Sequence, residues 1–383
     1  MNTSAPLQVD VLVVGAGHAA SVFARAAREF GYAGSILLVG DEAHLPYERP
    51  ALSKDMLRDP AYVHPPILAA EAWEELHVEL MLGRRIVAVD EAARSASLDD
   101  GRIIQWHRLV LATGARPRRL PGPAHPARHV IRTIDDALAV RARLGEFRNA
   151  RLVIVGAGPV GLEVAASLRP VVGSITVVEA ATQVMSRVVP AGLGEAIKSA
   201  HLENDIQMLM GTTVAEIVDG GGQTLDIVLS NGQRIAADLL IEGIGVVPEA
   251  PLAGDRGLAG AGGIEVNDCY VTANPAILAI GDVSCPPGGR KETWAHAESS
   301  GRAAARSIAG LEAEPMPPLS FWSDQFSRIQ VAGDPMQAKP AGRHGEAHLF
   351  ERDGIIVAAA AIGASRDFAA ARRLIGKPVA SGA

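Results

Sequence analysis

Two glycine-rich turns constrain the fold of this chain more than any other feature. The first turn, Gly-Ala-Gly-His-Ala-Ala over residues 15–20, lies between a predicted strand over 11–14 and a predicted helix over 21–30. The second, Gly-Ala-Gly-Pro-Val-Gly over 156–161, follows an apolar stretch over 153–155 and precedes a predicted helix over 162–168. One such turn is weak evidence, because many strand-to-helix turns are rich in glycine. Two copies, each followed by another apolar strand, predict two dinucleotide-binding βαβ units in an α/β fold.

The small residues of the first turn have different expected roles. Gly15 allows the strand to turn sharply, and Gly17 removes a side chain so that a pyrophosphate can approach the backbone. Ala20 keeps the close contact between helix and strand small. The unpaired N–H groups and the dipole at the start of the following helix favour an anion. In the second turn, Gly156, Gly158 and Gly161 stand at the corresponding positions.

Composition excludes several classes of protein. The 383 residues suffice for two or three domains, and a net charge of −7 with no long basic run argues against nucleic-acid binding. The two cysteines, Cys269 and Cys285, form no metal-ligand pattern, so we expect no metal site and no disulfide scaffold. A cytoplasmic, reducing location is therefore expected. The first ten residues lack a basic signal-peptide region, and no apolar run is long enough to span a membrane, so no membrane association is expected.

The segment after the first turn contains an acidic strand end and an unusual polar loop. A strand over 35–39 ends before Asp41 and Glu42, and either carboxylate can bind a ribose hydroxyl or simply be solvated. The loop over 45–54 combines prolines, two cations and a tyrosine. Beyond it we predict a short helix over 71–76, strands over 78–82 and 85–89, a hairpin with strands over 97–98 and 102–106, and a separate buried strand over 109–114.

The second half of the chain repeats this organisation and then departs from it. A proline- and arginine-rich loop over 115–126 leads to a helix over 134–143 and the second βαβ unit, whose strand over 175–178 ends at Glu179. Hairpin strands over 214–218, 225–229 and 233–235 precede a strand over 239–241 that leads to Gly243 and Gly245. A strand over 276–280 and a helix over 295–308 have no counterpart before the second turn, so we infer that the chain returns there to complete the first domain.

Prolines at 315–318 mark a further boundary. The tail beyond them is predicted to contain strands over 325–332, 346–351 and 355–361 and a helix over 368–374. The predicted domains are a discontinuous domain over 1–115 and 246–316, a second dinucleotide-binding domain over 116–245, and a small α+β domain over 317–383. The two larger domains are expected to be Rossmann-like.

The most specific stretches of the chain are Pro-Tyr-Glu-Arg-Pro over 46–50 with Leu52-Ser53-Lys54, and Phe-Trp-Ser-Asp-Gln over 321–325. They resemble one family, the single-FAD ferredoxin reductases that serve aromatic-ring dioxygenases and bacterial cytochromes P450. Rubredoxin reductases and apoptosis-inducing-factor-like flavoproteins are related to it. The glycine turns, Ala112-Thr113-Gly114 and Gly281-Asp282 extend the resemblance over nearly the whole chain, and Gly-His-Ala-Ala is most similar to reductases of dioxygenase systems.

The resemblance implies FAD in the first domain and NAD(H) in the second. Gly15, Gly17 and Ala19 would lie along the FAD pyrophosphate, Asp41 by the adenosine ribose, Val87 by the adenine, Asp282 by the ribityl chain and Trp294 beside the isoalloxazine. Arg49, Lys54, Thr113, Gly114, Arg132 and Gly281 complete the FAD set, and Gly156, Gly158, Gly161, Glu179 and Gly245 form the NAD(H) set.

The implied catalytic residues are Lys54 and Glu163, which would form an ion pair near flavin N5. The implied partner is a [2Fe-2S] ferredoxin that docks near Trp322, and the implied state is a monomer or a homodimer. Glu179 predicts a preference for NADH, because its carboxylate would repel a 2′-phosphate and the nearest following cation is Arg187. The chain departs from the family pattern at Pro159-Val160, Glu249-Ala250 and 362–365.

Other flavoproteins share the two glycine turns. A disulfide reductase needs a redox cysteine pair near the first helix, and an NADH oxidase or peroxidase usually needs one cysteine near the flavin. No cysteine precedes Cys269, which argues against both. A rubredoxin reductase, a reductase for a P450 ferredoxin and a non-enzymatic redox-sensing flavoprotein remain alternatives. The expected activity is NADH-dependent reduction of the ferredoxin that feeds an aromatic-ring dioxygenase.

Overall fold

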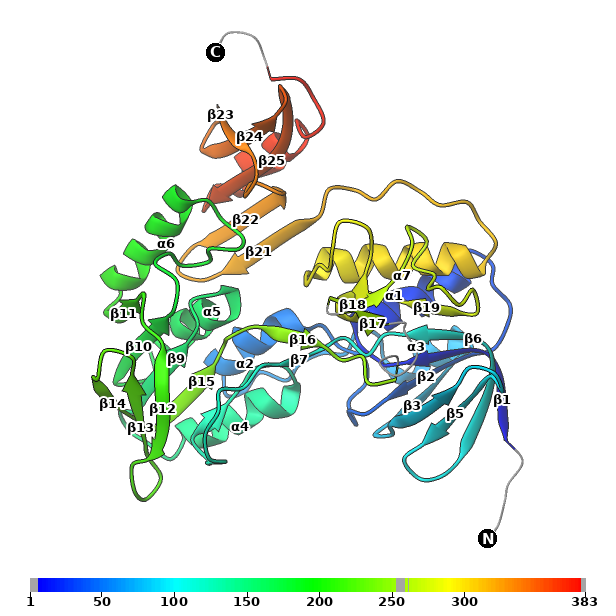
Figure 1. The fold of residues 1–383 in the computed structure, drawn as a ribbon, viewed down its shortest axis with the longest axis horizontal. Helices are drawn as coiled ribbons and strands as arrows, with labels where there is room; N and C mark the ends of the chain where they lie inside the picture. The colour runs from blue at the N-terminus through cyan, green and yellow to red at the C-terminus, as the bar shows by residue number, and fades with distance from the viewer. Residues whose placement is uncertain (1–5, 253–258, 261, 380–383) are drawn as a thin grey trace. The chain divides into compact units, whose positions relative to one another are not determined.

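The computed structural model describes residues 6–252, 259–260 and 262–379, and Figure 1 shows its elements. The chain forms two compact units, each built from separate segments. Unit 1 consists of Met1–Glu48, Pro65–Arg116 and Val247–Pro317, and unit 2 of Arg49–His64, Pro117–Val246 and Pro318–Ala383. The strands β7 (Ala115–Pro117) and β16 (Val246–Pro248) span two of the points where the chain passes from one unit to the other.

Unit 1 is built on a sheet with a parallel centre. Strand β1 (Leu7–Val14) lies between β2 (Ile36–Gly40) and β6 (Ile103–Leu111), and β3 (Val78–Leu82) pairs outside β2. The antiparallel strands β5 (Ser95–Leu98) and β4 (Ile86–Asp90) extend the sheet on the β6 side. All five residues of β2 are buried, which is typical of parallel strands covered on both faces.

A late segment of the chain joins this sheet. Strand β19 (Ile277–Ala279) pairs in parallel with β6, and helix α7 (Trp294–Ile308) packs on α1 (His18–Glu29), beside which it lies in Figure 1. The absence of a side chain at Gly301 permits this approach, because a Cβ there would lie 2.7 Å from the carbonyl oxygen of Ala19. The remaining elements of unit 1 are α3 (Ala70–Glu75), β17 (Ala259–Gly260), β18 (Gly263–Glu265), the 3₁₀ turn η3 (Gly281–Val283) and β20 (Ser284–Cys285).

One sequence prediction in this unit is wrong. The strands expected over 102–106 and 109–114 are a single strand, β6, which ends at Leu111. It pairs with β1 from Leu7 opposite Ile104 to Val14 opposite Leu111. The exposed pair His107 and Arg108 interrupts the apolar pattern without interrupting the backbone. Polar side chains at a solvent-facing point of a strand thus resembled a break between two strands.

Unit 2 contains the second βαβ arrangement. Its parallel sheet has the order β11 (Ile206–Met210), β10 (Ser174–Glu179), β9 (Arg151–Val155), β15 (Leu239–Glu242), β8 (Arg128–His129). The antiparallel strands β12 (Val214–Asp219), β13 (Leu225–Leu229) and β14 (Arg234–Ala237) form a separate sheet. The helices of this part are α4 (Ile134–Leu144), α5 (Pro159–Leu168) and α6 (Ala191–Glu203). The loop preceding Lys54 contains the 3₁₀ turn η1 (Arg49–Ser53), and α2 (Asp55–Arg58) follows it.

The tail of unit 2 has more strands than predicted. Five antiparallel strands pair in the order β21 (Ser320–Asp324), β22 (Arg328–Gly333), β25 (Ile355–Ile362), β24 (Ala347–Arg352), β23 (Lys339–His344), and α8 (Ser365–Arg372) packs on them. The sequence predicted three strands and placed the first of them over 325–332. The structure instead turns between Asp324 and Arg328. Strand β23 was not predicted because its sequence does not alternate between apolar and polar residues: it contains Pro340 and Gly342, and most of its side chains are exposed.

Helix α6 buries a histidine, His201. His201 is 1% exposed, and its two ring nitrogens face the carbonyl oxygens of Ile197 and Leu162. Burial lowers the pKa of His201 from its ordinary value of 6.5, although the two carbonyls favour the protonated ring. The unfolded chain therefore takes up a proton near pH 6.5 more readily than the folded chain. The neutral, buried ring of His201 therefore makes its full contribution to the free energy of unfolding above that pH. This contribution is lost as the pH falls through the lower pKa of the folded state.

We therefore predict that His201→Asn reduces the loss of thermal stability on acidification. The melting temperature is measured by circular dichroism at about pH 7.5 and about pH 5.5. The difference between the two temperatures should be smaller in His201→Asn than in the unchanged protein. His344→Asn, on the exposed strand β23, is the matched control and should leave the difference unchanged. An equal acid effect in His201→Asn and the unchanged protein would contradict the prediction.

Candidate functional site

The first glycine turn in unit 1 has the geometry of an anion-binding turn. Gly15 has φ +109° and its N–H donates to the Val39 carbonyl at 2.7 Å, while a Cβ at this position would collide with the Ala112 carbonyl oxygen. Gly17 is the N-cap of α1, and no heavy atom lies within 4 Å of the position its Cβ would occupy. No side chain caps α1, and its first turn contains no acidic residue. The helix start is thus available to a phosphate.

The residues expected at the adenosine end of this site lie on the surface of unit 1. Asp41 follows β2, and its carboxylate pairs with the guanidinium of Arg85 at 3.0 Å, with both side chains largely exposed. The alternative carboxylate, Glu42, accepts a hydrogen bond from the Tyr47 hydroxyl. Val87 lies on β4 and is 53% exposed. Any ribose contact of Asp41 therefore competes with its ion pair to Arg85.

Two further expected FAD residues bind a neighbouring segment of unit 1. The Thr113 hydroxyl donates to the backbone carbonyl of Glu249, and the Glu249 N–H donates to the Gly114 carbonyl at 2.9 Å. Gly114 adopts φ +72°, in the left-handed region that favours glycine. These bonds fix the chain that follows β6, at the edge where the parallel strands end.

The start of helix α7 carries an aromatic stack. Trp294 begins the helix, and its ring stacks on His18 with centroids 4.8 Å apart. Burial lowers the pKa of His18, although the carboxylates of Glu48 and Glu298 oppose the shift. Nearby, the backbone N–H of Gly281 donates to the Ser300 hydroxyl at 3.0 Å, and Asp282 follows in η3. The sequence shows His18 only as a member of the first glycine turn, and its stacking on Trp294 has no signature in the sequence.

The second glycine turn, in unit 2, repeats the geometry of the first. Gly156 has φ +106° and donates to the Val178 carbonyl at 2.8 Å, and a Cβ there would collide with the Gly243 carbonyl oxygen. Gly158 is the N-cap of α5, with open space at its Cβ position. A Cβ at Gly161 would collide with the Gly156 carbonyl oxygen, so this position requires glycine for packing.

Glu179 ends β10 beside this turn. One carboxylate oxygen accepts the Ala157 N–H at 2.6 Å, and the other accepts the Ala181 N–H at 2.8 Å. The carboxylate is therefore held in one orientation, and each oxygen retains acceptor capacity for a ribose hydroxyl. Gly245 adopts φ +92°, and a guanidinium nitrogen of Arg187 lies 3.7 Å from the position its Cβ would occupy.

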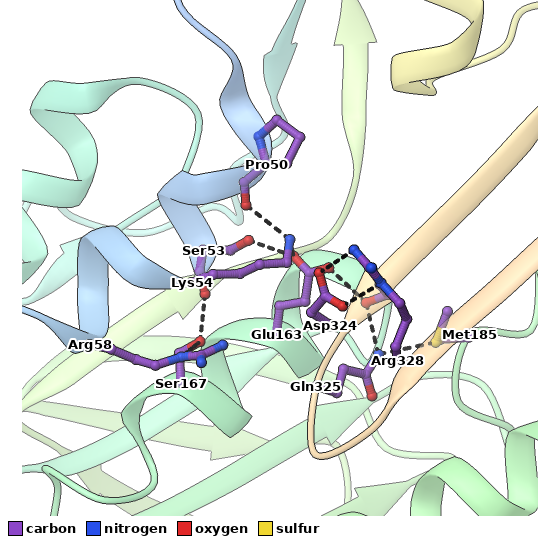
Figure 2. A network of polar contacts seen from close by, with 11 residues as sticks. Pro50, Ser53, Lys54, Arg58, Glu163, Ser167, Met185, Asp324, Gln325 and Arg328 are labelled. Carbon is purple, nitrogen blue, oxygen red and sulfur yellow. Dashed lines mark hydrogen bonds and ion pairs between the residues drawn. The ribbon is translucent and has the colours of Figure 1, made fainter. Parts of the chain in front are cut away.

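Unit 2 contains a buried ion pair between Lys54 and Glu163 (Figure 2). The Lys54 ammonium lies 2.8 Å from Oε2 of Glu163 and donates to the Pro50 carbonyl at 2.9 Å. The side chains are 9% and 6% exposed. Glu163 also accepts hydrogen bonds from the hydroxyls of Ser53 and Ser323. The structure thus brings together Lys54 and Glu163, which are 109 positions apart in the chain.

Other residues of the predicted site also make hydrogen bonds within unit 2. The Arg49 guanidinium donates to the Arg132 carbonyl, and the Arg132 N–H donates to the carboxylate of Asp136 at 3.0 Å. Ser53 is held in turn by Ser167, whose hydroxyl donates to the Ser53 carbonyl at 2.9 Å. Trp322 lies half-buried on β21, next to Ser323. Within the described ranges, no cluster of three His, Cys, Asp or Glu side chains is arranged to hold a metal ion.

Comparison with known proteins defines the class of this fold and site. The model of the pyridine nucleotide-disulphide oxidoreductase family matches residues 9–301, and a model of the reductase C-terminal domain matches residues 320–382. The chain belongs to the pyridine nucleotide-disulphide oxidoreductase family. The predicted α/β fold with two dinucleotide-binding regions and a small C-terminal part is confirmed.

Individual relatives cover nearly the whole chain. The ferredoxin–NAD(+) reductase component of the p-cumate 2,3-dioxygenase system of Pseudomonas putida is 36% identical over 378 residues, 95% of this chain and 92% of that protein. The corresponding component of the anthranilate 1,2-dioxygenase system of Burkholderia cepacia is 36% identical over 383 residues, covering 95% and 93%.

Solved structures of reductases share the fold. The ferredoxin reductase for the CYP199A2 system of Rhodopseudomonas palustris superposes with a TM-score of 0.85 at 33% identity, covering 92% of this chain and 91% of that one. Putidaredoxin reductase, in its covalent complex with putidaredoxin, gives a TM-score of 0.90 at 28% identity and covers 97% and 93%. The predicted resemblance to these reductases is confirmed.

The buried pair yields a prediction on stability. Lys54→Met leaves the Glu163 carboxylate buried without its cation, which costs about 3–5 kcal/mol. Lys54→Met combined with Glu163→Leu removes both charges and should be less destabilising than Lys54→Met alone. The free energy of unfolding in urea measures both effects.

The matched control is Lys198→Met. Lys198 pairs with Glu195 at 3.3 Å on α6, where Glu195 is exposed, so its loss should change the free energy of unfolding by less than about 1 kcal/mol. A double variant less stable than Lys54→Met would show that the two charges are not coupled.

Proposed function

We propose that this chain is an NADH-dependent ferredoxin reductase that passes electrons from NADH through FAD to a small [2Fe-2S] ferredoxin feeding an aromatic-ring dioxygenase. The observation that carries the proposal is the buried Lys54–Glu163 pair in a chain with two glycine turns of the same geometry. Relatives named as ferredoxin–NAD(+) reductase components of dioxygenase systems support the substrate class.

We assign one nucleotide to each of the two domains that contain a glycine turn. Residues 1–115 and 246–316 bind FAD, 116–245 bind NADH, and 317–383 form the interface domain. The open backbone at Gly17 and the uncapped start of α1 suit a pyrophosphate, with Ala19 buried beneath it. Gly158 and α5 offer the same arrangement to the second nucleotide. We assign the remaining FAD contacts to Asp41, Arg49, Val87, Thr113, Gly114, Arg132, Gly281, Asp282 and Trp294.

The chain supplies orientation and charge, and the cofactor supplies the redox chemistry. The chemistry that bound FAD would supply is the acceptance of a hydride from NADH and the release of single electrons to the ferredoxin. The buried Lys54 ammonium lies 2.8 Å from Oε2 of Glu163, and the attraction between the two charges offsets the cost of burying them. Two backbone N–H groups donate hydrogen bonds to the Glu179 carboxylate and fix its orientation, in which it can accept from the ribose hydroxyls of NADH. No protein nucleophile is needed, so the scheme requires no cysteine.

A redox titration tests the proposal. Anaerobic NADH should bleach one bound flavin per chain, and added [2Fe-2S] ferredoxin should then reoxidise it. Faster transfer to a rubredoxin, or to the ferredoxin of a P450 system, would favour those alternative partners. Stoichiometric bleaching without turnover on any one-electron acceptor would favour the non-enzymatic, redox-sensing alternative.

We further propose a cytoplasmic protein, either a monomer or a homodimer. None of the described helices is long and apolar enough to cross a membrane.

Glu179 gives a prediction on the nucleotide. A 2′-phosphate would meet a carboxylate fixed by Ala157 and Ala181, and such like-charge contacts cost several kcal/mol. The ratio of kcat/KM for NADH to that for NADPH should fall about 100-fold or more in Glu179→Ala. Adding Ala180→Arg should lower it further.

Glu195→Ala, on the exposed side of α6, is the charge-matched control and should leave the ratio unchanged. An unchanged protein that uses NADPH as well as NADH would show that Glu179 does not contact the ribose.

Trp322 gives a prediction on the partner. It lies on β21, and we propose that the ferredoxin docks beside it. Trp322→Ala should slow reduction of the ferredoxin about tenfold or more, as the loss of an interface aromatic commonly does. Reduction of the flavin by NADH should not change. Equal losses in both half-reactions would instead assign Trp322 to packing.

A further inference from the structure

Strand β21 supplies one of the groups that hold Glu163. The Ser323 hydroxyl donates to Oε1 of Glu163 at 2.7 Å, and the Ser323 side chain is fully buried. The other carboxylate oxygen, Oε2, receives the Ser53 hydroxyl and the Lys54 ammonium. Three donors from two separate segments of the chain thus converge on one carboxylate, and the donor on Oε1 comes from the C-terminal part of the chain.

The bond from Ser323 has a fixed direction. The amide nitrogen of Gln325 donates to the Ser323 hydroxyl oxygen at 3.1 Å. A carboxylate only accepts, so the single proton of the Ser323 hydroxyl is directed to Glu163, while the Gln325 amide occupies a lone pair of the same hydroxyl oxygen. The same amide nitrogen lies 3.4 Å from the sulfur of Met185, as Figure 2 shows. Met185 is buried and adopts φ +49°, so Gln325 is seated against a fixed neighbour.

The turn that contains Gln325 is closed by an ion pair. Asp324 and Arg328, at the two ends of the turn, lie 2.8 Å apart. Side chains alternate along a strand, so Ser323 points to the face opposite that of Trp322 and Asp324. The hairpin therefore presents one face to Glu163 and keeps the other for Trp322.

We propose that Ser323 is a positioning residue for the Lys54–Glu163 pair, and that Gln325 orients Ser323. Glu163 is fixed on one side by the segment that carries Lys54 and on the other by β21. The importance of the pair for oxidation of NADH rests on the proposed function, whereas the positioning itself does not. The C-terminal part of the chain accordingly contributes to the charged centre as well as to the surface around Trp322.

The reactivity of the Lys54 amine measures positioning directly. The chain has five lysines, and Lys54 is the buried one. The holoenzyme is treated briefly with acetic anhydride, and acetylation of Lys54 is compared with that of Lys198 by peptide mass spectrometry. Ser323→Ala should raise the relative acetylation of Lys54 about tenfold, because a Glu163 carboxylate without its donor on Oε1 is free to rotate and no longer keeps Oε2 beside the ammonium. Ser323→Thr retains the hydroxyl and should restore protection.

Two further variants define the origin of the effect. Ser320 lies on the same strand as Ser323, but Ser323 is the residue of β21 that bonds Glu163. Ser320→Ala should therefore leave Lys54 as resistant to acetylation as in the unchanged protein. Gln325→Leu retains Ser323 but removes its orienting donor, so it should raise Lys54 acetylation to a smaller extent. Gln325→Leu keeps the proposal testable if Ser323→Ala does not fold.

The proposal is overturned if folded Ser323→Ala, or folded Gln325→Leu, leaves Lys54 as protected as in the unchanged protein. It is also overturned if Ser320→Ala exposes Lys54 equally. In the stopped-flow reduction of the flavin by NADH, Ser323→Ala should lower the rate constant about tenfold with little change in the apparent affinity for NADH. A protein that does not oxidise NADH at all would contradict the proposed function, and the acetylation result would still decide the role of Ser323.

Discussion

The ion pair between Lys54 and Glu163 is the interaction on which the arrangement of unit 2 depends. Removing two charges from water is costly, and their mutual attraction offsets that cost only when the geometry is good and the remaining polar groups are bonded. Here Glu163 has three donors, and Lys54 has the Pro50 carbonyl in addition to the carboxylate. These bonds require η1, α5 and β21 to meet at one point. Three segments from distant parts of the sequence are therefore specified together.

The two glycine turns obey a second constraint, which is steric. In each turn the first glycine adopts a positive φ, and a Cβ there would strike a carbonyl oxygen of the neighbouring strand end. In each, the next glycine caps the helix and leaves open space. The same backbone solution thus recurs in both units, and it explains why the fold class was readable from Gly15, Gly17, Gly156 and Gly158. The glycine positions can be read directly from the sequence, although the carbonyl oxygens that require them belong to distant segments.

Features that depend on tertiary contacts were harder to predict. The continuity of β6 through His107 and Arg108, and the strands β21 and β23, were missed because their side-chain patterns are not periodic. Lys54 and Glu163 were anticipated through the resemblance to reductases. Their supports Ser53, Ser323 and Gln325 were not, because only the folded chain shows which hydroxyl reaches which carboxylate. The surface pairing of Asp41 with Arg85 was likewise invisible in the sequence.

We propose that the buried Lys54–Glu163 pair serves reduction of the flavin by NADH. The most direct test of this proposal is a stopped-flow measurement of a single turnover of Lys54→Met with NADH, under anaerobic conditions and without ferredoxin. Loss of one preorganised charged group in an enclosed site commonly slows a reaction about 100-fold or more. We expect a decrease of that size with little change in FAD content. A rate of flavin reduction in Lys54→Met equal to that of the unchanged protein would contradict the account.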